Sequence, residues 1–389
     1  MATETKVCGY LIRPIDAGSF PLDSDLERYR KGAADIEKDS SSQAEDAHYF
    51  IEEHNKTFRR KAVAMGSRSA VAAYAQCRGM IDQFLEPVFR SVLDVNEEGS
   101  EIIISEKTAQ QVAAMIAQGN AKISTSDAPM PEIIALERDA KALCENLETD
   151  FLRYKACITG PLELTLNFQR LLGFPRVYDS TLVEFFTGVV KAFVENSRRN
   201  TKHLRSEVIS LDEPSIGLEG LADFFSDTGA DTNLTHLQSC WNRIYDAVPS
   251  DSFRGLHLHT SPFEQLFKAE WNLLEAHVGV FVKGDWLEQY DKFIRAAIMR
   301  TDGPDIPKGE DLKAAWERIR TGDYEQYLEK PDDMMTALKR CVERYGVERV
   351  PFAGPECGLG PWDWPHGDVM ALRNLETVNK SVRKFNSSS

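Results

Sequence analysis

The sequence predicts an α/β fold of the (β/α)8 barrel type, because short strand-like runs alternate with amphipathic segments along the chain. Eight runs have strand-like composition, at residues 8–14, 69–74, 155–159, 207–213, 254–259, 278–282, 294–299 and 349–354. Segments 182–200 and 332–346 carry apolar residues at helical spacing, and Gly346 is a helix stop signal. Alternating strands and helices favour parallel pairing, and about eight such units favour a closed TIM barrel over an open sheet.

The domain organisation follows from length and pattern. The chain has 389 residues, 42% of them hydrophobic, which suits one large domain or two ordinary ones. We expect residues 1–389 to form a single barrel domain, with a helical and polar excursion near residues 90–150 between two barrel units. No internal repeat is visible in the sequence.

Charge and cysteine content narrow the class of protein. The net charge of −15 makes the chain a poor candidate for binding nucleic acid or an anionic membrane. No apolar run approaches the roughly 18–20 residues that span a bilayer, and the N-terminus lacks the features of a signal peptide. We therefore expect a cytoplasmic protein. Its seven cysteines are widely spaced and form no CxxC pair, so a disulfide framework is not expected.

A barrel directs the search for a functional site to the carboxyl ends of its strands and the loops that follow them. Candidate stretches combine a strand end with Gly, Pro or charged residues, and they lie at 17–21, 158–161, 211–214, 257–259, 300–305 and 354–360.

His257, His259 and Cys357 form the sharpest candidate group. Residues i and i+2 of a strand point to the same side, so the two imidazoles of the HLH run can share one metal ion. Imidazole nitrogen and thiolate sulfur are common zinc ligands, and three protein ligands with one open position are typical of catalytic zinc. Spacing alone leaves the alternative open, in which two strand-end histidines and a buried thiol bind nothing.

Acidic strand ends supply further candidates. Asp212 and Glu213 are adjacent, so one side chain is expected at the barrel mouth and the other against a neighbouring helix or loop. The alternative is a carboxylate that caps the next helix, whose first turn Pro214 would fit. Asp302 and Asp305 could be an acid–base pair or metal ligands, but they also fit ordinary turn chemistry.

Two loops remain open to two interpretations each. Gly18 and Ser19 could offer backbone N–H groups to an anionic substrate, or simply form a tight turn. Trp362, Trp364 and His366 could line a pocket mouth, or pack their loop against the barrel rim.

Taken in order, these motifs resemble the cobalamin-independent methionine synthase family, within the zinc-barrel superfamily that it shares with uroporphyrinogen decarboxylase. The resemblance rests on AGSFP (17–21), ITGP (158–161), VISLDEP (208–214), HLH (257–259) and GPECGLG (354–360). It runs from about residue 10 to residue 380 and covers only the family's catalytic barrel.

The resemblance implies a zinc-dependent thiol S-methyltransferase. The metal would bind the acceptor thiol, homocysteine or a related small molecule, as a thiolate. The methyl donor would be a methylated corrinoid, free or protein-bound, or a methyl-tetrahydropterin. Carried over by position, the zinc ligands would be His257, His259 and Cys357, with His259 in place of a family cysteine.

The resemblance also assigns substrate contacts. Asp212 matches a partner of the acceptor's amino group, and Gly18 and Ser19 match the loop that holds its carboxylate. A second amino-group partner, a glutamate in the family, falls at Tyr74 to Gln76, where this chain has no carboxylate.

Two further positions depart from the family pattern. The family's glutamate ligand aligns with Phe281, which cannot bind metal. Its catalytic histidine aligns near Asp302, which becomes the candidate general acid or fourth ligand. Acceptor recognition therefore looks altered, and two rival functions stay open. One is alkyl transfer to another thiol such as coenzyme M, and the other is a non-catalytic family member that has lost its metal.

Overall fold

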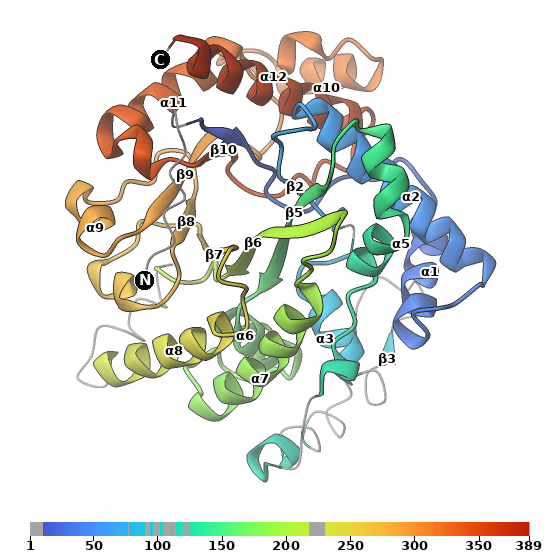
Figure 1. Ribbon diagram of the computed structural model, residues 1–389, viewed down its shortest axis with the longest axis vertical. Helices are drawn as coiled ribbons and strands as arrows, with labels where there is room; N and C mark the ends of the chain where they lie inside the picture. Colours follow the sequence, from blue (N-terminus) through green and yellow to red (C-terminus); the bar gives the residue numbers. More distant parts are fainter. Residues whose placement is uncertain are drawn as a thin grey trace.

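The computed structural model describes residues 11–76, 78–89, 94–95, 102–103, 110, 114–119, 124–217 and 230–388 (Figure 1). Cys8 and Cys77 lie outside these ranges, and the other five cysteines are free thiols. Within the described ranges, every helix is too short or too polar to cross a bilayer.

Eight parallel strands form the centre of the molecule, which confirms the predicted barrel. They are β1 (Arg13–Pro14), β2 (Ala72–Ala73), β5 (Leu152–Thr159), β6 (Leu204–Asp212), β7 (Phe253–Leu258), β8 (Leu273–Ala276), β9 (Phe293–Met299) and β10 (Phe352–Pro355). Their order in the sheet is β1-β10-β9-β8-β7-β6-β5-β2. Parallel bridges Ile15–Val71 and Ser19–Gln76 join the first strand to the last and close the sheet on itself.

One predicted strand is wrong. Residues 278–282 form a loop, in which Gly279 has φ +83° and the Phe281 side chain is 61% exposed. The barrel strand at this place is β8, which pairs with β7 on one side and β9 on the other. The valine and phenylalanine content of residues 278–282 suggested a strand there, but the strand is formed by the buried residues just before this loop, Leu273–Ala276.

Helices cover the outside of the barrel (Figure 1). They are α1 (Leu26–Lys38), α2 (Glu45–Ala64), α3 (Asp82–Phe89), α5 (Pro131–Asn146), α6 (Pro161–Leu171), α7 (Ser180–Ser197), α8 (Ala230–Tyr245), α9 (Gly284–Gln289), α10 (Leu312–Arg320), α11 (Pro331–Tyr345) and α12 (Gly367–Ser388). Short 3-10 turns lie at Thr125–Asp127, Glu264–Lys268, Glu325–Tyr327 and Val347–Arg349.

The two helices predicted from periodicity are present as α7 and α11. Helix α11 buries Met334, Met335 and Leu338 on one face, and it ends at Gly346, whose φ of +82° favours glycine. Helix α12 packs on β1, β10 and α2, and so covers the place where the first strand of the chain pairs with the last.

The predicted excursion at 90–150 is helical only in part. Helix α5 packs against α2 and β5, so it belongs to the outer layer of the barrel. The short strands β3 (Asp94–Val95) and β4 (Ile102–Ile103) pair antiparallel where helix was expected. Most of the residues between 90 and 123 lie outside the described ranges.

A buried charged layer crosses the barrel interior below the strand ends. Lys155 of β5 forms an ion pair with Glu275 of β8, and Arg295 of β9 lies 3.7 Å from the same carboxylate. Lys155 also donates to the Ala17 carbonyl, and Arg295 donates to the Glu356 carbonyl. The layer thus ties the loops after β1 and β10 to the barrel, and these loops shape the candidate site.

Candidate metal centre

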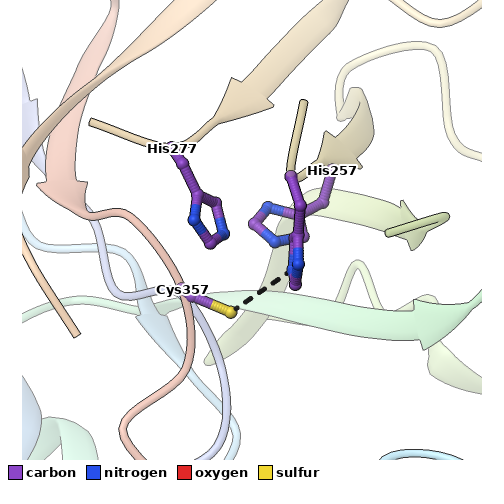
Figure 2. A group of neighbouring side chains, drawn as sticks. His257, His277 and Cys357 are labelled. Atoms are coloured by element: carbon purple, nitrogen blue, oxygen red, sulfur yellow. Dashed lines mark hydrogen bonds between the residues drawn. The ribbon is translucent and has the colours of Figure 1, made fainter. Parts of the chain in front are cut away.

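Four side chains gather at the carboxyl ends of β7, β8 and β10. His257 lies in β7, His259 just after it, His277 directly after β8, and Cys357 after β10. One ligand atom from each lies within 4.8 Å of all the others. Figure 2 shows His257, His277 and Cys357 pointing toward one another, and the Cys357 sulfur lies 3.8 Å from Nε2 of His259.

Strand register brings these residues together. His257 pairs with Asp212 of β6 on one side and with Glu275 of β8 on the other, so three strand ends are aligned. The first residue after β8 is therefore His277, beside the His257–His259 run.

Glu356 connects the loops that carry the cluster. Its carboxylate accepts the N–H groups of Val278, at 2.9 Å, and Thr301, at 3.0 Å. It also lies 3.8 Å from Nδ1 of His277. One buried carboxylate thus holds the loops after β8, β9 and β10 in register.

The three imidazoles are in the neutral form that binds metals. Burial lowers the pKa of His257 well below its usual value, lowers that of His259 to about 4, and lowers that of His277. Burial raises the pKa of the Cys357 thiol to about 11, so this ligand would release a proton on binding a metal.

The donor set fits a zinc ion. Nε2 of His257 and Nε2 of His277 are buried, and neither has a hydrogen-bond partner in the described part of the chain. An unpartnered buried polar atom is costly, and a bound cation would remove that cost at both nitrogens. Imidazole nitrogen and thiolate sulfur are common zinc ligands, so the three neutral imidazoles and the thiol can hold the ion.

A cavity of about 680 Å³ opens above the cluster. Its lining includes His257, Cys357, Asp212, Ser19 and Gln76. The loop residues Trp362, Trp364 and His366 also line it. Trp362 is also buried, and its indole N–H donates to the Thr301 carbonyl. This loop therefore both lines the cavity and packs on the barrel.

The two adjacent carboxylates at the end of β6 face different surroundings, as predicted. Asp212 lines the cavity, and burial raises its pKa to about 7. Glu213 points into the protein, where it accepts the N–H groups of Leu162 and Glu163 and the indole N–H of Trp241. It therefore caps the N-terminus of α6, whereas the sequence pointed to the helix that follows.

The Gly18–Ser19 loop is both a turn and a cavity wall. Gly18 has φ +149°, and a Cβ there would meet the Cys157 sulfur at 3.0 Å. The Ser19 hydroxyl accepts the Gly360 N–H at 3.1 Å. A Cβ at Gly358 would lie 2.1 Å from the same hydroxyl, so the approach of the two loops requires glycine there.

Three other candidate residues have different environments. The Tyr74 side chain is buried, and its hydroxyl donates to the Cys157 carbonyl, so it supports the barrel instead of contacting a substrate. Gln76 lines the cavity, and its Nε2 is buried with no partner among the described residues. Asp302 is exposed after β9, outside the four-residue cluster, and its charge raises the pKa of His277 only as a minor effect.

His277 was missed by sequence reasoning. The expected fourth-ligand position was assigned to Phe281, which is exposed in the loop beyond the cluster. The available signal was the run LLEAH at 273–277, an apolar strand that ends in histidine as LHLH does. Glu275 interrupts the apolar pattern of that run, and its charge is satisfied inside the barrel by Lys155.

Comparison with known proteins identifies relatives by structure alone. No family model and no curated protein matches the chain. Its fold is similar to a B12-independent methionine synthase from Shewanella sp. W3-18-1 in complex with selenomethionine, with 11% identity, a TM-score of 0.52, and coverage of 97% of this chain and 100% of the other.

Two further structures give the same result. A methyltransferase from Methanosarcina mazei has 12% identity and a TM-score of 0.53, with 96% and 94% of the two chains covered. A putative vitamin-B12-independent methionine synthase from Listeria monocytogenes has 13% identity and a TM-score of 0.51, with 96% and 98% covered. The structural neighbours are thus those that the sequence motifs suggested, and at these identities they establish the fold.

Proposed function

We propose that this chain, which has the fold of the B12-independent methionine synthases, is a zinc-dependent thiol S-methyltransferase. The observation that supports this most strongly is the four-residue cluster of His257, His259, His277 and Cys357, two of whose members, His257 and Cys357, line a substrate-sized cavity. The cavity lies at the carboxyl ends of the strands, which is where barrel enzymes carry out their chemistry.

The four clustered side chains would hold the zinc ion. When bound, zinc supplies a Lewis acid that lowers the pKa of an acceptor thiol and holds it as the thiolate. Glu356 positions His277 by fixing its loop through the N–H group of Val278.

Other residues of the cavity would orient the acceptor. Asp212 has a buried carboxylate with a pKa of about 7, so it can pair with an ammonium group or exchange a proton near neutral pH. The Nε2 of Gln76, which has no partner within the described ranges, and the Ser19 loop offer polar contacts to an anionic end. Gly18 contributes by allowing the turn that exposes this loop.

The rim suits a larger methyl donor. The cavity volume falls within the roughly 300–1,000 Å³ of small-molecule sites, so it can take a thiol together with the methyl-bearing part of a donor. Trp364 lines the rim with a buried indole N–H that has no partner among the described residues. A methylated corrinoid, free or protein-bound, and a methyl-tetrahydropterin are the donors to test.

The decisive experiment is a thiol panel assayed with zinc-loaded protein. Homocysteine, coenzyme M and 3-mercaptopropionate are each supplied with methylcobalamin or with methyltetrahydrofolate, and the methylated thiol is measured. Turnover that depends on zinc and on Cys357 supports the proposal. Protein that takes up no zinc at micromolar concentration, and methylates no thiol, would be the non-catalytic alternative.

A second candidate function is alkyl transfer to a thiol that lacks an α-amino group, such as coenzyme M. It is favoured by the environment at 74–76, where the structure has a buried tyrosine and an amide in place of a second carboxylate. The same panel separates the two candidates by the kinetic preference among thiols.

A further inference from the structure

A second cluster of metal-binding side chains lies outside the barrel, between α7 and α8. Glu184 belongs to α7, and His236 and Cys240 belong to α8, one helical turn apart. One ligand atom from each lies within 4.8 Å of the others. This cluster has no part in the function proposed above.

The spacing of the ligand atoms matches a metal site. Nε2 of His236 lies 2.9 Å from Oε1 of Glu184. The Cys240 sulfur lies 3.8 Å from the same nitrogen and 3.9 Å from the same oxygen. Zinc bonds of about 2.0–2.3 Å place tetrahedral ligands roughly 3.3–3.7 Å apart, so small side-chain shifts suffice.

A supporting contact orients the histidine. Nδ1 of His236 lies 2.6 Å from the Tyr178 hydroxyl, so Nε2 faces the cluster. Metal-binding histidines usually have such a partner on the other ring nitrogen.

Arg243 at present supplies the positive charge in this cluster. One of its guanidinium nitrogens lies 2.8 Å from each carboxylate oxygen of Glu184 and 3.1 Å from the Cys240 sulfur. The Arg243 side chain is 46% exposed. Exposed ion pairs contribute little, so this side chain can turn into solvent at small cost.

We propose that Glu184, His236 and Cys240 bind a divalent cation of the zinc or cadmium class, and that Arg243 leaves the cluster when the cation enters. The Cys240 thiol loses its proton to solvent on binding, and water completes the coordination. The bound ion cross-links α7 to α8 on the outer layer of the barrel.

The test is a cadmium titration of full-length protein that reads the ultraviolet absorption of cadmium–thiolate bonds. The Cys357→Ser variant removes the thiolate of the barrel centre. In that variant we expect one cadmium–thiolate site per chain, which disappears in Cys357→Ser/Cys240→Ser. Cys357→Ser/Cys341→Ser is the matched control, because Cys341 is a half-buried helix cysteine outside both clusters. Equal absorption with and without Cys240 would overturn the proposal.

A second variant keeps the test valid if Cys240→Ser folds poorly. Arg243→Gln in the Cys357→Ser background removes the competing cation, and we expect cadmium affinity to rise by about two- to fivefold, as loss of an exposed ion pair predicts. An unchanged or weaker affinity would contradict the displacement of Arg243. Failure of these cadmium readings leaves the barrel centre, and so the proposed function, unaffected.

Discussion

At the scale of single residues, the barrel centre depends on imidazoles that burial keeps neutral. His257 and His277 each have a buried Nε2 that finds no partner among the residues the structure describes, which makes both nitrogens available for a metal. The barrel fixes the position of each residue. His257 is held by the pairing of β7 with β6, and the loop of His277 is held by Glu356, which accepts the Val278 N–H.

Removing a ligand should remove the metal. We expect His257→Ala and Cys357→Ala to abolish stoichiometric zinc. His277→Ala should weaken zinc binding by at least the roughly 10–100-fold that loss of an outer-shell partner costs. Competition against a chromophoric chelator measures these affinities. Phe281→Ala is the control, since its exposed side chain should leave zinc affinity unchanged, and an equal loss in this variant would reject His277 as the fourth ligand.

His54 should make stability depend on pH. Its Nδ1 lies 3.0 Å from the Asn55 amide oxygen, and its Nε2 accepts the Ala75 N–H, which requires a neutral ring. Burial lowers its pKa from 6.5 to about 4. The unfolded chain therefore binds more protons between these values, so this stabilisation is complete above pH 6.5 and is lost as pH falls toward 4.

The difference between wild type and His54→Gln isolates this contribution, because the barrel-centre imidazoles affect both proteins. Between about pH 7.5 and pH 5, wild type should lose about 2 kcal/mol more unfolding free energy than the variant. Denaturant unfolding at the two pH values measures it. Parallel losses in the two proteins would show that the ring is not neutral when folded.

Residue positions were predictable where the strand pattern continues to the end of the strand. His257 and Asp212 lie near the ends of long strands and line the cavity, and His259 lies directly beyond β7 in the same cluster as His257. Tyr74 was placed at the substrate site by the family resemblance, and in the structure its side chain is buried and its hydroxyl donates to the Cys157 carbonyl.

At the scale of elements, the N-terminus of α6 depends on a side chain from another strand. Gly160 precedes this helix, and a Cβ there would lie 2.2 Å from the Glu213 carboxyl carbon. The Glu213 carboxylate accepts two backbone N–H groups of the first turn, so it satisfies donors that the helix leaves unpaired. The ITGP and LDEP motifs are thus parts of one contact.

Substituting this carboxylate should be costly to stability. Glu213→Ala leaves two buried backbone donors and the Trp241 indole N–H without their acceptor, which we expect to lower the free energy of unfolding by roughly 3 kcal/mol. Thermal and denaturant unfolding measure the change. Glu343→Ala, at an exposed position of α11, should stay within about 0.5 kcal/mol of wild type. A similarly small change at Glu213 would mean that water replaces the carboxylate as acceptor.

Element prediction succeeded where composition and packing agree. Strands β5, β6, β7 and β9 are long and buried, and α7 and α11 each bury one face, so local pattern identified them. Strand β8 was missed because Glu275 interrupts its apolar pattern. The buried carboxylate is stabilised by an ion pair with Lys155 of β5, a distant contact that local composition does not reveal.

At the scale of the whole molecule, the cavity is assembled from the loops that follow β1, β2 and β10 and from the ends of β6 and β7. Barrel closure through the Ser19–Gln76 bridge brings the first two loops beside each other. Which side chains line the cavity depends on this contact between residues far apart in the sequence. Short sequence motifs could therefore predict which loops form the site, but not which of their side chains line the cavity.

The assembled cavity predicts which thiol is preferred. Homocysteine carries an ammonium group, and the cavity offers Asp212 for it but has the amide of Gln76 where a second carboxylate was expected. Loss of one charged hydrogen bond costs roughly 1.5–3 kcal/mol, or about ten- to a hundredfold in affinity. A thiol with an anionic end needs only donors, which the Ser19 loop and Nε2 of Gln76 provide. Coenzyme M and 3-mercaptopropionate should therefore be at least as good as homocysteine by kcat/KM.

Two variants separate recognition of the two ends of the acceptor. Asp212→Asn removes the carboxylate that an ammonium group would contact, so it should reduce homocysteine turnover more than turnover of the thiols without an amino group. Gln76→Glu adds a negative charge beside Ser19, so it should raise kcat/KM for homocysteine relative to coenzyme M by about tenfold. A clear wild-type preference for homocysteine, unchanged by Gln76→Glu, would show that other groups recognise the amino end and that the chain acts as a methionine synthase.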